Sequence, residues 1–182
     1  MAFTLGVLAI GALCVVWYLS TFNGLIGSRY AVDQSWANVE VELKRRVDLI
    51  ANLVETTKGY AAHERHALAE TTALRLGRVA NATEANAAEP ATTQLVARLL
   101  AVAEAYPELK ADAQFRALQQ ELSGTENRIA DRRQAYNATV NAYNTRCESA
   151  PSNIVAALHQ FQLKTFFDAP PEADRLPRVS LS

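Results

Sequence analysis

The hydrophobic pattern of the chain changes character near residue 28. Residues 1 to 28 carry no charged side chain, and residues 3 to 19 are almost continuously apolar. After that point apolar side chains recur every three or four positions, as in Val39, Leu43 and Ile50. An apolar run of about 20 residues can cross the ~30 Å hydrocarbon core of a bilayer. Since no proline precedes Pro90, we predict one helix over residues 2 to 58, membrane-spanning at its start and amphipathic afterwards.

The predicted span, residues 1 to 27, is typical of an uncleaved, single-pass anchor. Its lipid-facing side chains are expected to be Leu5, Leu8, Ile10, Leu13, Val16, Trp17, Leu19 and Phe22. Aromatic residues gather at its C-terminal side, where membrane proteins place an aromatic belt. The run lacks a basic beginning and a clean small-x-small cleavage site, which argues against a signal peptide. Basic residues follow the span and none precedes it, which favours a cytoplasmic bundle, although only Arg29 lies close.

The remainder of the chain predicts further helices. We expect them near residues 61 to 82, 91 to 106 and 115 to 147, with a short one at 153 to 158. Residues 81 to 89 are expected to form a loop, with Pro90 in the first turn of the next helix, and Pro107 is expected to end that helix. The strongest seam comprises Phe115, Leu118, Leu122, Thr125, Ile129, Arg132, Tyr136, Val140, Tyr143 and Cys147.

These elements predict an all-α fold: an elongated antiparallel bundle of three to four helices behind an N-terminal transmembrane helix. The bundle is expected to cover residues 28 to 160, with the first helix and the helix at 115 to 147 packed against each other. A tail, residues 161 to 182, follows it. Phe161, Phe166 and Phe167 are expected to dock part of this tail on the bundle, with docking on lipid as the alternative.

Charge separates the chain into an uncharged beginning and a balanced remainder. All 18 basic and 19 acidic residues lie after residue 28, and their near cancellation gives no argument for nucleic acid as a partner. We expect the run Lys44-Arg45-Arg46 to be a solvated face, with contact to lipid headgroups or a partner as the alternative. The pairs Tyr136-Asn137 and Tyr143-Asn144, seven residues apart, suit an interhelical contact. The candidate contacts to a partner or a second copy are therefore Lys44, Arg45, Arg46, Arg132, Tyr136 and Tyr143.

Candidate chemistry is sparse. His63 and His66 are three residues apart, with Glu64 between them, whereas the HExxH motif requires histidines four apart. Weak metal binding there is kept as an alternative to surface histidines. The chain contains no phosphate-binding loop, dinucleotide fingerprint, nucleophile elbow or CxxC pair. We therefore predict no catalytic residue, no cofactor and no metal, and expect Cys14 and Cys147 to be small buried hydrophobes.

Several stretches together resemble the LemA family. They are VDQSW at 32–36, VELKRRVDLI at 41–50, NLVETTKGYAAHE at 52–64, LLAVAEAYPELK at 99–110, GTENRIA at 124–130, RQAYN at 133–137 and YNT at 143–145. The blocks occur in the family's order from about residue 29 to 167. The segment LHQFQLK at 158–164 departs from the family, which carries a glycine-rich stretch there. The resemblance implies a short N-terminal anchor and a long-helix bundle without settled activity, and with some relatives associated with membrane remodelling and organelle biogenesis.

Three hypotheses for function follow. The first is a non-enzymatic, membrane-anchored scaffold that forms homo-oligomers or binds a membrane protein partner, with membrane lipid as its other contact. The second is a membrane-tethered signalling or sensor subunit that transmits a change along the first helix. The third is a weak metal-binding or enzymatic bundle around His63 and His66.

Overall fold

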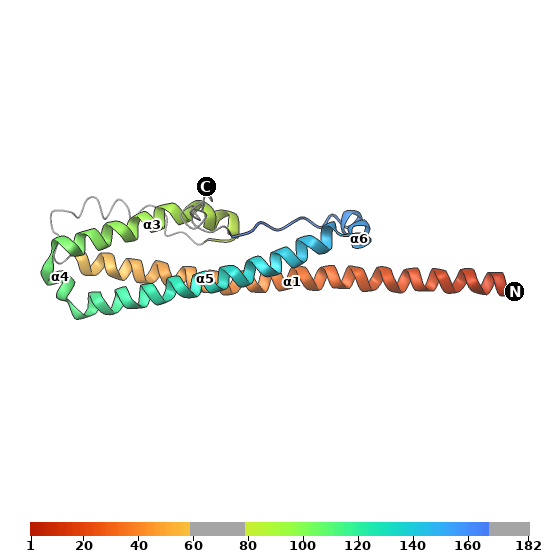
Figure 1. The fold of residues 1–182 in the computed structure, drawn as a ribbon, viewed down its shortest axis with the longest axis horizontal. Helices are drawn as coiled ribbons and strands as arrows, with labels where there is room; N and C mark the ends of the chain where they lie inside the picture. The colour runs from red at the N-terminus through yellow and green to blue at the C-terminus, as the bar shows by residue number, and fades with distance from the viewer. Residues whose placement is uncertain (59–78, 168–182) are drawn as a thin grey trace, which may run out of the picture.

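The computed structural model of the protein describes residues 1–58 and 79–167, which form five helices and no strand. The helices are α1 (Ala2–Lys58), α3 (Ala82–Ala105), α4 (Pro107–Ala111), α5 (Ala113–Glu148) and α6 (Ser152–Leu158). The predicted all-α, elongated antiparallel bundle is confirmed (Figure 1). Most of the helix predicted at 61 to 82 lies outside the described residues, and its described end, 79 to 81, is not helical.

The longest element is α1, with 57 residues, which at 1.5 Å per residue is about 85 Å long. Figure 1 shows α5 running back along the C-terminal half of α1, with α3 beside them at the end farther from the N-terminus. At the opposite end of the bundle, α6 lies against α1. Beyond α6 the first part of α1 projects alone, as the predicted continuous helix from span to bundle requires.

The beginning of α3 differs from the prediction of a loop at residues 81 to 89. Asn81 caps the helix by accepting a hydrogen bond from the Glu84 amide at 3.0 Å, and Glu84 in turn accepts one from the Ala80 amide at 2.9 Å. Ala82 and Ala85 are buried. The loop prediction was wrong because this cap and the helix-forming alanines outweigh Pro90, which sits inside α3 and removes one backbone bond.

The break after α3 follows the prediction from Pro107. Tyr106 has an extended backbone (φ −120°, ψ 91°), as the residue before a proline prefers. The single short helix α4 then turns the chain. Asp112 begins α5 by accepting a bond from the Phe115 amide at 2.8 Å. A sharp reversal with both helix ends capped lets α3 and α5 lie on the same half of α1.

The core consists of two apolar clusters arranged end to end. The cluster nearer the span contains Leu25, Val32, Val39, Leu43, Ala82, Ala85, Ile129, Tyr136, Val140, Tyr143, Cys147, Val155, Ala156 and Phe167. The farther cluster contains Leu49, Ile50, Leu53, Val54, Leu95, Leu99, Val102, Ala103, Leu109, Phe115 and Leu122. The two clusters contain residues from separate parts of α1, α3 and α5. The apolar core is therefore interrupted on all three helices at the same level of the bundle.

Two glycines of α1 provide a test of its continuity. A methyl group at Gly27 would meet no atom within 4 Å. We expect Gly27→Ala to stabilise the protein by about 0.5–1 kcal/mol, because alanine loses less conformational entropy in a helix. This raises the midpoint of thermal unfolding, followed by circular dichroism of the full chain in detergent, by about 2–4 °C per kcal/mol.

The matched control for this substitution is Gly24→Ala. Its methyl group would approach Nη1 of Arg146 to 3.0 Å, and that atom donates a hydrogen bond to the Gly24 carbonyl at 2.7 Å. The gain at Gly24 should therefore be smaller than at Gly27. A loss of stability in Gly27→Ala would mean that α1 bends at this point.

Candidate functional site

The part of α1 that projects from the bundle, which we call the apolar rod, is not covered by any other described part of the chain. An 18-residue window of this helix is long and apolar enough to span a membrane, and no part of the window is buried within the chain. Of the side chains predicted to face lipid, seven are exposed: Leu5, Leu8, Ile10, Leu13, Val16, Trp17 and Leu19. The eighth, Phe22, is half-buried where the bundle begins. Cys14 is also exposed on this rod.

The junction between rod and bundle is aromatic and polar. The ring of His159 packs 4.5 Å from that of Phe22, centroid to centroid, and its Nε2 shares a hydrogen bond with the Tyr18 hydroxyl. Phe161 lies edge-on to Phe22 at 6.1 Å. Nη1 of Arg146 in α5 donates to the Gly24 carbonyl and, at 2.8 Å, to the Ser28 hydroxyl. These contacts attach α5 and the end of α6 to α1 directly beyond the apolar segment.

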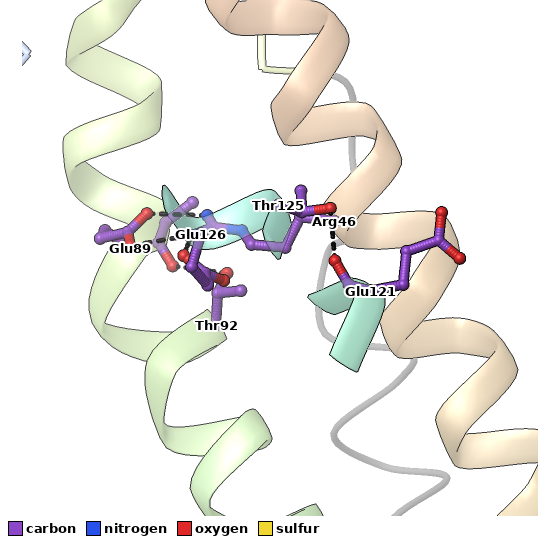
Figure 2. Close-up of polar contacts among 7 residues, drawn as sticks. Arg46, Glu89, Thr92, Glu121, Thr125 and Glu126 are labelled. Atoms are coloured by element: carbon purple, nitrogen blue, oxygen red, sulfur yellow. Dashed lines mark hydrogen bonds and ion pairs between the residues drawn. The ribbon is translucent and has the colours of Figure 1, made fainter. Parts of the chain in front are cut away.

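A layer of charged side chains fills the gap between the two apolar clusters. We define the charged layer as Glu42, Arg45 and Arg46 of α1, Glu89 of α3, and Glu121, Glu126 and Arg128 of α5. At its centre the Arg46 guanidinium donates two bonds to Glu89, at 2.9 and 2.7 Å, and one to Glu126 at 3.4 Å (Figure 2). Two outer pairs, Arg45 with Glu121 and Arg128 with Glu42, join α1 to α5 on either side.

The burial of Arg46 contradicts the expectation that the Lys44-Arg45-Arg46 run is entirely a solvated face. Arg46 is 5 % exposed, because it lies three residues after Leu43 and four before Ile50 on the inward stripe. Burial alone lowers its pKa, but the bonds and charges of Glu89 and Glu126 outweigh that effect, so the pKa of Arg46 is raised overall. Arg46 therefore keeps its positive charge inside the bundle.

Of the two carboxylates that face Arg46, Glu126 is the one whose ionised form is less well stabilised. Burial raises its pKa, the charge of Arg46 opposes that shift, and repulsion from Glu89 adds to it, with a raised pKa as the result. One cation, Arg46, faces two carboxylates. Glu89 accepts two hydrogen bonds from it, and both are shorter than the single bond to Glu126. Protonation of Glu126 is thus easier than that of a solvated glutamate.

The repeated Tyr-Asn pairs of α5 hold the segment that follows α6. We call residues 162–167 the strap, an extended segment that runs antiparallel to α5. The Asn144 side chain exchanges two bonds with the backbone of Lys164, both at 2.9 Å, and Asn137 does the same with Phe167, both at 2.9 Å. Tyr143 and Tyr136 donate to the carbonyls of Gln162 and Thr165, each at 2.9 Å.

This pairing works because two spacings agree. Asn137 and Asn144 are seven residues apart, which on a helix is about 10.5 Å. Lys164 and Phe167 are three residues apart, which on an extended chain is about 10 Å. Each asparagine side chain bonds to both the N–H and the C=O of one strap residue, as the backbone of a neighbouring β-strand would. Burial, with Cys147 adding to the effect, raises the pKa of Tyr143 to about 12, so its hydroxyl remains a donor at neutral pH.

Aromatic packing completes the attachment of the strap. Phe167 is fully buried, with the Trp36 ring 6.1 Å away and the Arg133 guanidinium 5.8 Å from its centroid. Trp36 also meets Tyr136 edge-on at 5.4 Å. Of the three phenylalanines expected to dock part of the tail, Phe167 is buried in the core and Phe161 is half-buried against it, whereas Phe166 is 39 % exposed.

The six candidate contact residues divide into two groups. Lys44, Arg45 and Arg132 are exposed. Arg46, Tyr136 and Tyr143 point inward and are engaged within the chain, Arg46 in the charged layer and the tyrosines on the strap. The seam expected to include Arg132 instead passes through Arg133, which is half-buried. His63 and His66 lie outside the described residues, and the part of the chain that the structure covers offers no group of three or more histidine, cysteine or acidic residues able to hold a metal.

Sequence reasoning missed the acidic partners of Arg46. Nothing in the local sequence of Glu89 or Glu126 marks them as partners of α1, since they are 43 and 80 residues away from Arg46. The available signal was the phase of α1, which places Arg46 on the apolar stripe. A buried arginine needs acceptors, so that phase implied carboxylates on the facing helices.

An apolar rod continuous with a capped antiparallel bundle defines a membrane-associated protein of an all-helical class. The model of the LemA family matches residues 35–181, so the chain belongs to the LemA family. It is similar to magnetosome proteins MamQ 1 and MamQ 2 of Paramagnetospirillum magneticum, each 25 % identical over 199 residues covering 92 % of this chain and 73 % of the relative. MamQ of Magnetospirillum gryphiswaldense is 24 % identical over the same coverage.

The stretches that resemble the family contain most residues of the charged layer and the residues that bind the strap. VELKRRVDLI contributes Glu42, Arg45 and Arg46 to the charged layer, and GTENRIA contributes Glu126 and Arg128. RQAYN and YNT contribute the tyrosines and asparagines that bind the strap. The stretches that identify the family therefore contain the polar residues that join the helices and the strap to one another.

Removing one acidic partner of Arg46 should depend strongly on which one is removed. We expect Glu89→Gln to destabilise the full chain by about 3 kcal/mol, because the neutral amide has only one acceptor oxygen and leaves the charge of the buried guanidinium opposed only by the more distant Glu126. We expect Glu126→Gln to change stability by less than about 1 kcal/mol, since the double bond to Glu89 remains. Chemical unfolding of both variants in detergent measures the difference, and equal effects would contradict the assigned geometry.

The same pair predicts a pH dependence. The pKa of Glu126 is higher in the folded protein than the unfolded value of about 4.3. Stability from its protonation is therefore present below the unfolded pKa and is lost as pH rises through the folded pKa. The stability of Glu126→Gln relative to the parent should therefore increase as the pH rises above about 4.3. If the difference in the free energy of unfolding between parent and variant does not change with pH, this prediction is wrong.

Weakening the strap should open it locally. Asn144→Ala leaves the amide and carbonyl of Lys164 without their partner, which costs about 1–3 kcal/mol. Hydrogen exchange at the Lys164 and Phe167 amides should accelerate while the middle of α5 stays protected. Asn141→Ala is the matched control, because Asn141 is exposed on the same helix. Unchanged exchange at Lys164 would show that the side-chain pairing contributes nothing to holding the strap.

Proposed function

We propose that this protein is a single-pass, non-enzymatic scaffold that assembles with copies of itself on the membrane. One observation carries the proposal: α1 is a single helix from the exposed apolar rod through the charged layer to the far end of the bundle. Such a helix holds the bundle at a fixed direction relative to the bilayer. A rigid projection of this kind suits holding other molecules in place.

The use of polar groups inside the bundle supports the same proposal. In the described residues, the buried arginine bonds to two glutamates, and the inward tyrosines and asparagines bond to the strap. These groups join one element to another. Membership of the LemA family, some of whose members the sequence resemblance associates with membrane remodelling, and the similarity to magnetosome proteins support a role in membrane organisation.

The outward face of α1 is the surface we propose for assembly. Tyr30 and Val41 are 63 % and 65 % exposed and lie 11 residues apart, about three helical turns, on one face. Lys44 lies near the same face and is exposed. Copies in one membrane have parallel α1 helices, so a contact along this face continues from the span into the bundle.

Cross-linking through this face tests the proposal. In a background carrying Cys14→Ala, we expect Val41→Cys to give disulfide-linked dimers in native membranes on mild oxidation. Arg98→Cys, at an exposed position of α3, is the matched control and should remain uncross-linked. Native mass spectrometry in detergent should show oligomers for the parent and a shift toward monomer for Val41→Glu. A parent that is strictly monomeric in membrane and detergent would overturn self-assembly.

A further inference from the structure

The chain has a second uncharged stretch that the fold places beside the first. Residues 149–163 contain no aspartate, glutamate, lysine or arginine, and after residue 28 no other uncharged stretch is as long. The stretch contains α6 and the turn that follows it. Figure 1 shows α6 at the end of the bundle from which the first part of α1 projects. The two uncharged segments, more than 100 residues apart in sequence, therefore meet at one place.

The helix α6 is two-sided. Val155 and Ala156 are 1 % and 3 % exposed and belong to the core cluster nearer the span. Ile154 and Leu158, four residues apart, are 66 % and 68 % exposed and face away from the bundle. These fractions are close to those of most leucines on the apolar rod, such as Leu8 at 70 %. Two large aliphatic side chains on so short a helix are thus left mostly uncovered by the described chain.

The depth of α6 is set by its contacts with α1. His159, directly after α6, bonds to Tyr18 and packs at a tilt against the ring of Phe22. Tyr18 and Phe22 are aromatic residues at the C-terminal end of the apolar run. Gln160 has a φ of 53°, and the Phe161 amide donates to the Ala156 carbonyl at 3.0 Å, which fixes the turn after α6. The end of α6 is thereby held at the level of the aromatic belt, where a bilayer changes from hydrocarbon to headgroups.

We propose that α6 is a second membrane contact, with Ile154 and Leu158 inserted into the interfacial layer of the bilayer that α1 spans. The exposed apolar surface of α1 continues onto these two side chains at the depth where interfacial helices bury their apolar faces. Arg29, half-buried over the Phe161 ring, and Arg146 lie next to this level on the bundle side, where anionic headgroups favour cations. The inference rests on the proposed span of α1 and extends it by naming lipid as the occupant of α6.

Site-directed fluorescence on the full chain in liposomes tests the inference. Single cysteines replace Ile154, Leu158, Arg98 and Leu13 in a Cys14→Ala background, and each carries an environment-sensitive dye. The buried Cys147 is measured as background in the variant without an added cysteine. The readouts are the emission wavelength and quenching by phospholipids with a nitroxide on the acyl chain near the headgroup. Arg98 is exposed on α3, at the end of the bundle farther from the N-terminus and outside the proposed assembly face, and serves as the water-side control.

The expected result is a blue-shifted, lipid-quenched dye at Ile154 and Leu158, as at Leu13, with a water-like, unquenched dye at Arg98. Quenching at Leu13 together with a water-like, unquenched dye at both α6 positions would overturn the α6 contact while leaving the anchor intact. A blue shift at α6 without lipid quenching would also overturn it, since protein would then be the cover. Absence of quenching at Leu13 would instead overturn the anchor itself.

Discussion

The single constraint on which the bundle depends is the burial of Arg46 between two apolar clusters. A guanidinium that is 5 % exposed must be met by acceptors. Only one relative position of α1, α3 and α5 brings Glu89 and Glu126 to it at the same time. A buried ion group of this kind contributes little net stability, because the desolvation of the charges offsets their attraction. Its larger effect is on register: a slip of any one helix by a turn would leave a charge unpaired.

The apolar pattern of these helices leaves register weakly determined, and that is why the charged layer matters. Helix α3 is rich in alanine, whose small side chain can pack against a neighbouring helix at several positions. The two clusters alone could accommodate a shift of a helix along its neighbour. Between them, Arg45 with Glu121 and Arg128 with Glu42 place charges of opposite sign on α1 and α5 at both sides of Arg46. The layer therefore selects one alignment among several of similar apolar burial.

Much of this architecture could be predicted from periodicity, and the failures have identifiable causes. The inward stripes of α1 and α5 follow from steps of three and four. From Ile129 to Tyr136, however, seven residues divide equally well as three plus four or four plus three, so the pattern alone could not choose between Arg132 and Arg133. The structure chooses Arg133, which covers the Phe167 ring. That preference comes from the strap, whose position depends on hydrogen bonds from α5 that no local pattern encodes. The partners of Arg46 were equally out of reach of local sequence, and the early start of α3 required weighing the Asn81 cap against Pro90.

The strap joins parts of the molecule that would otherwise be independent. It binds α5 through two asparagines, receives a bond from the Asn86 side chain of α3 at 3.1 Å, and pairs Lys164 with Asp33 of α1 at 2.8 Å. It begins beside α6 and ends under Trp36. The position of α6 is therefore coupled to the three long helices through one extended segment.

This coupling bears on how a helical bundle can hold a defined orientation on a membrane. One transmembrane helix resists sliding along its axis, because its apolar length must match the hydrocarbon layer. It resists rotation about that axis only weakly, since lipid surrounds it on every side. The proposed contact of Ile154 and Leu158 lies off the axis of α1, so it would add a restoring force against rotation and tilt. Because His159 bonds the end of α6 to α1, and the strap bonds to α5 and α1, that force would act on the whole bundle and would present the face bearing Tyr30 and Val41 in one direction. Parallel copies with the same rotational setting meet more often in the orientation that brings these faces together, which lowers the entropic cost of assembly.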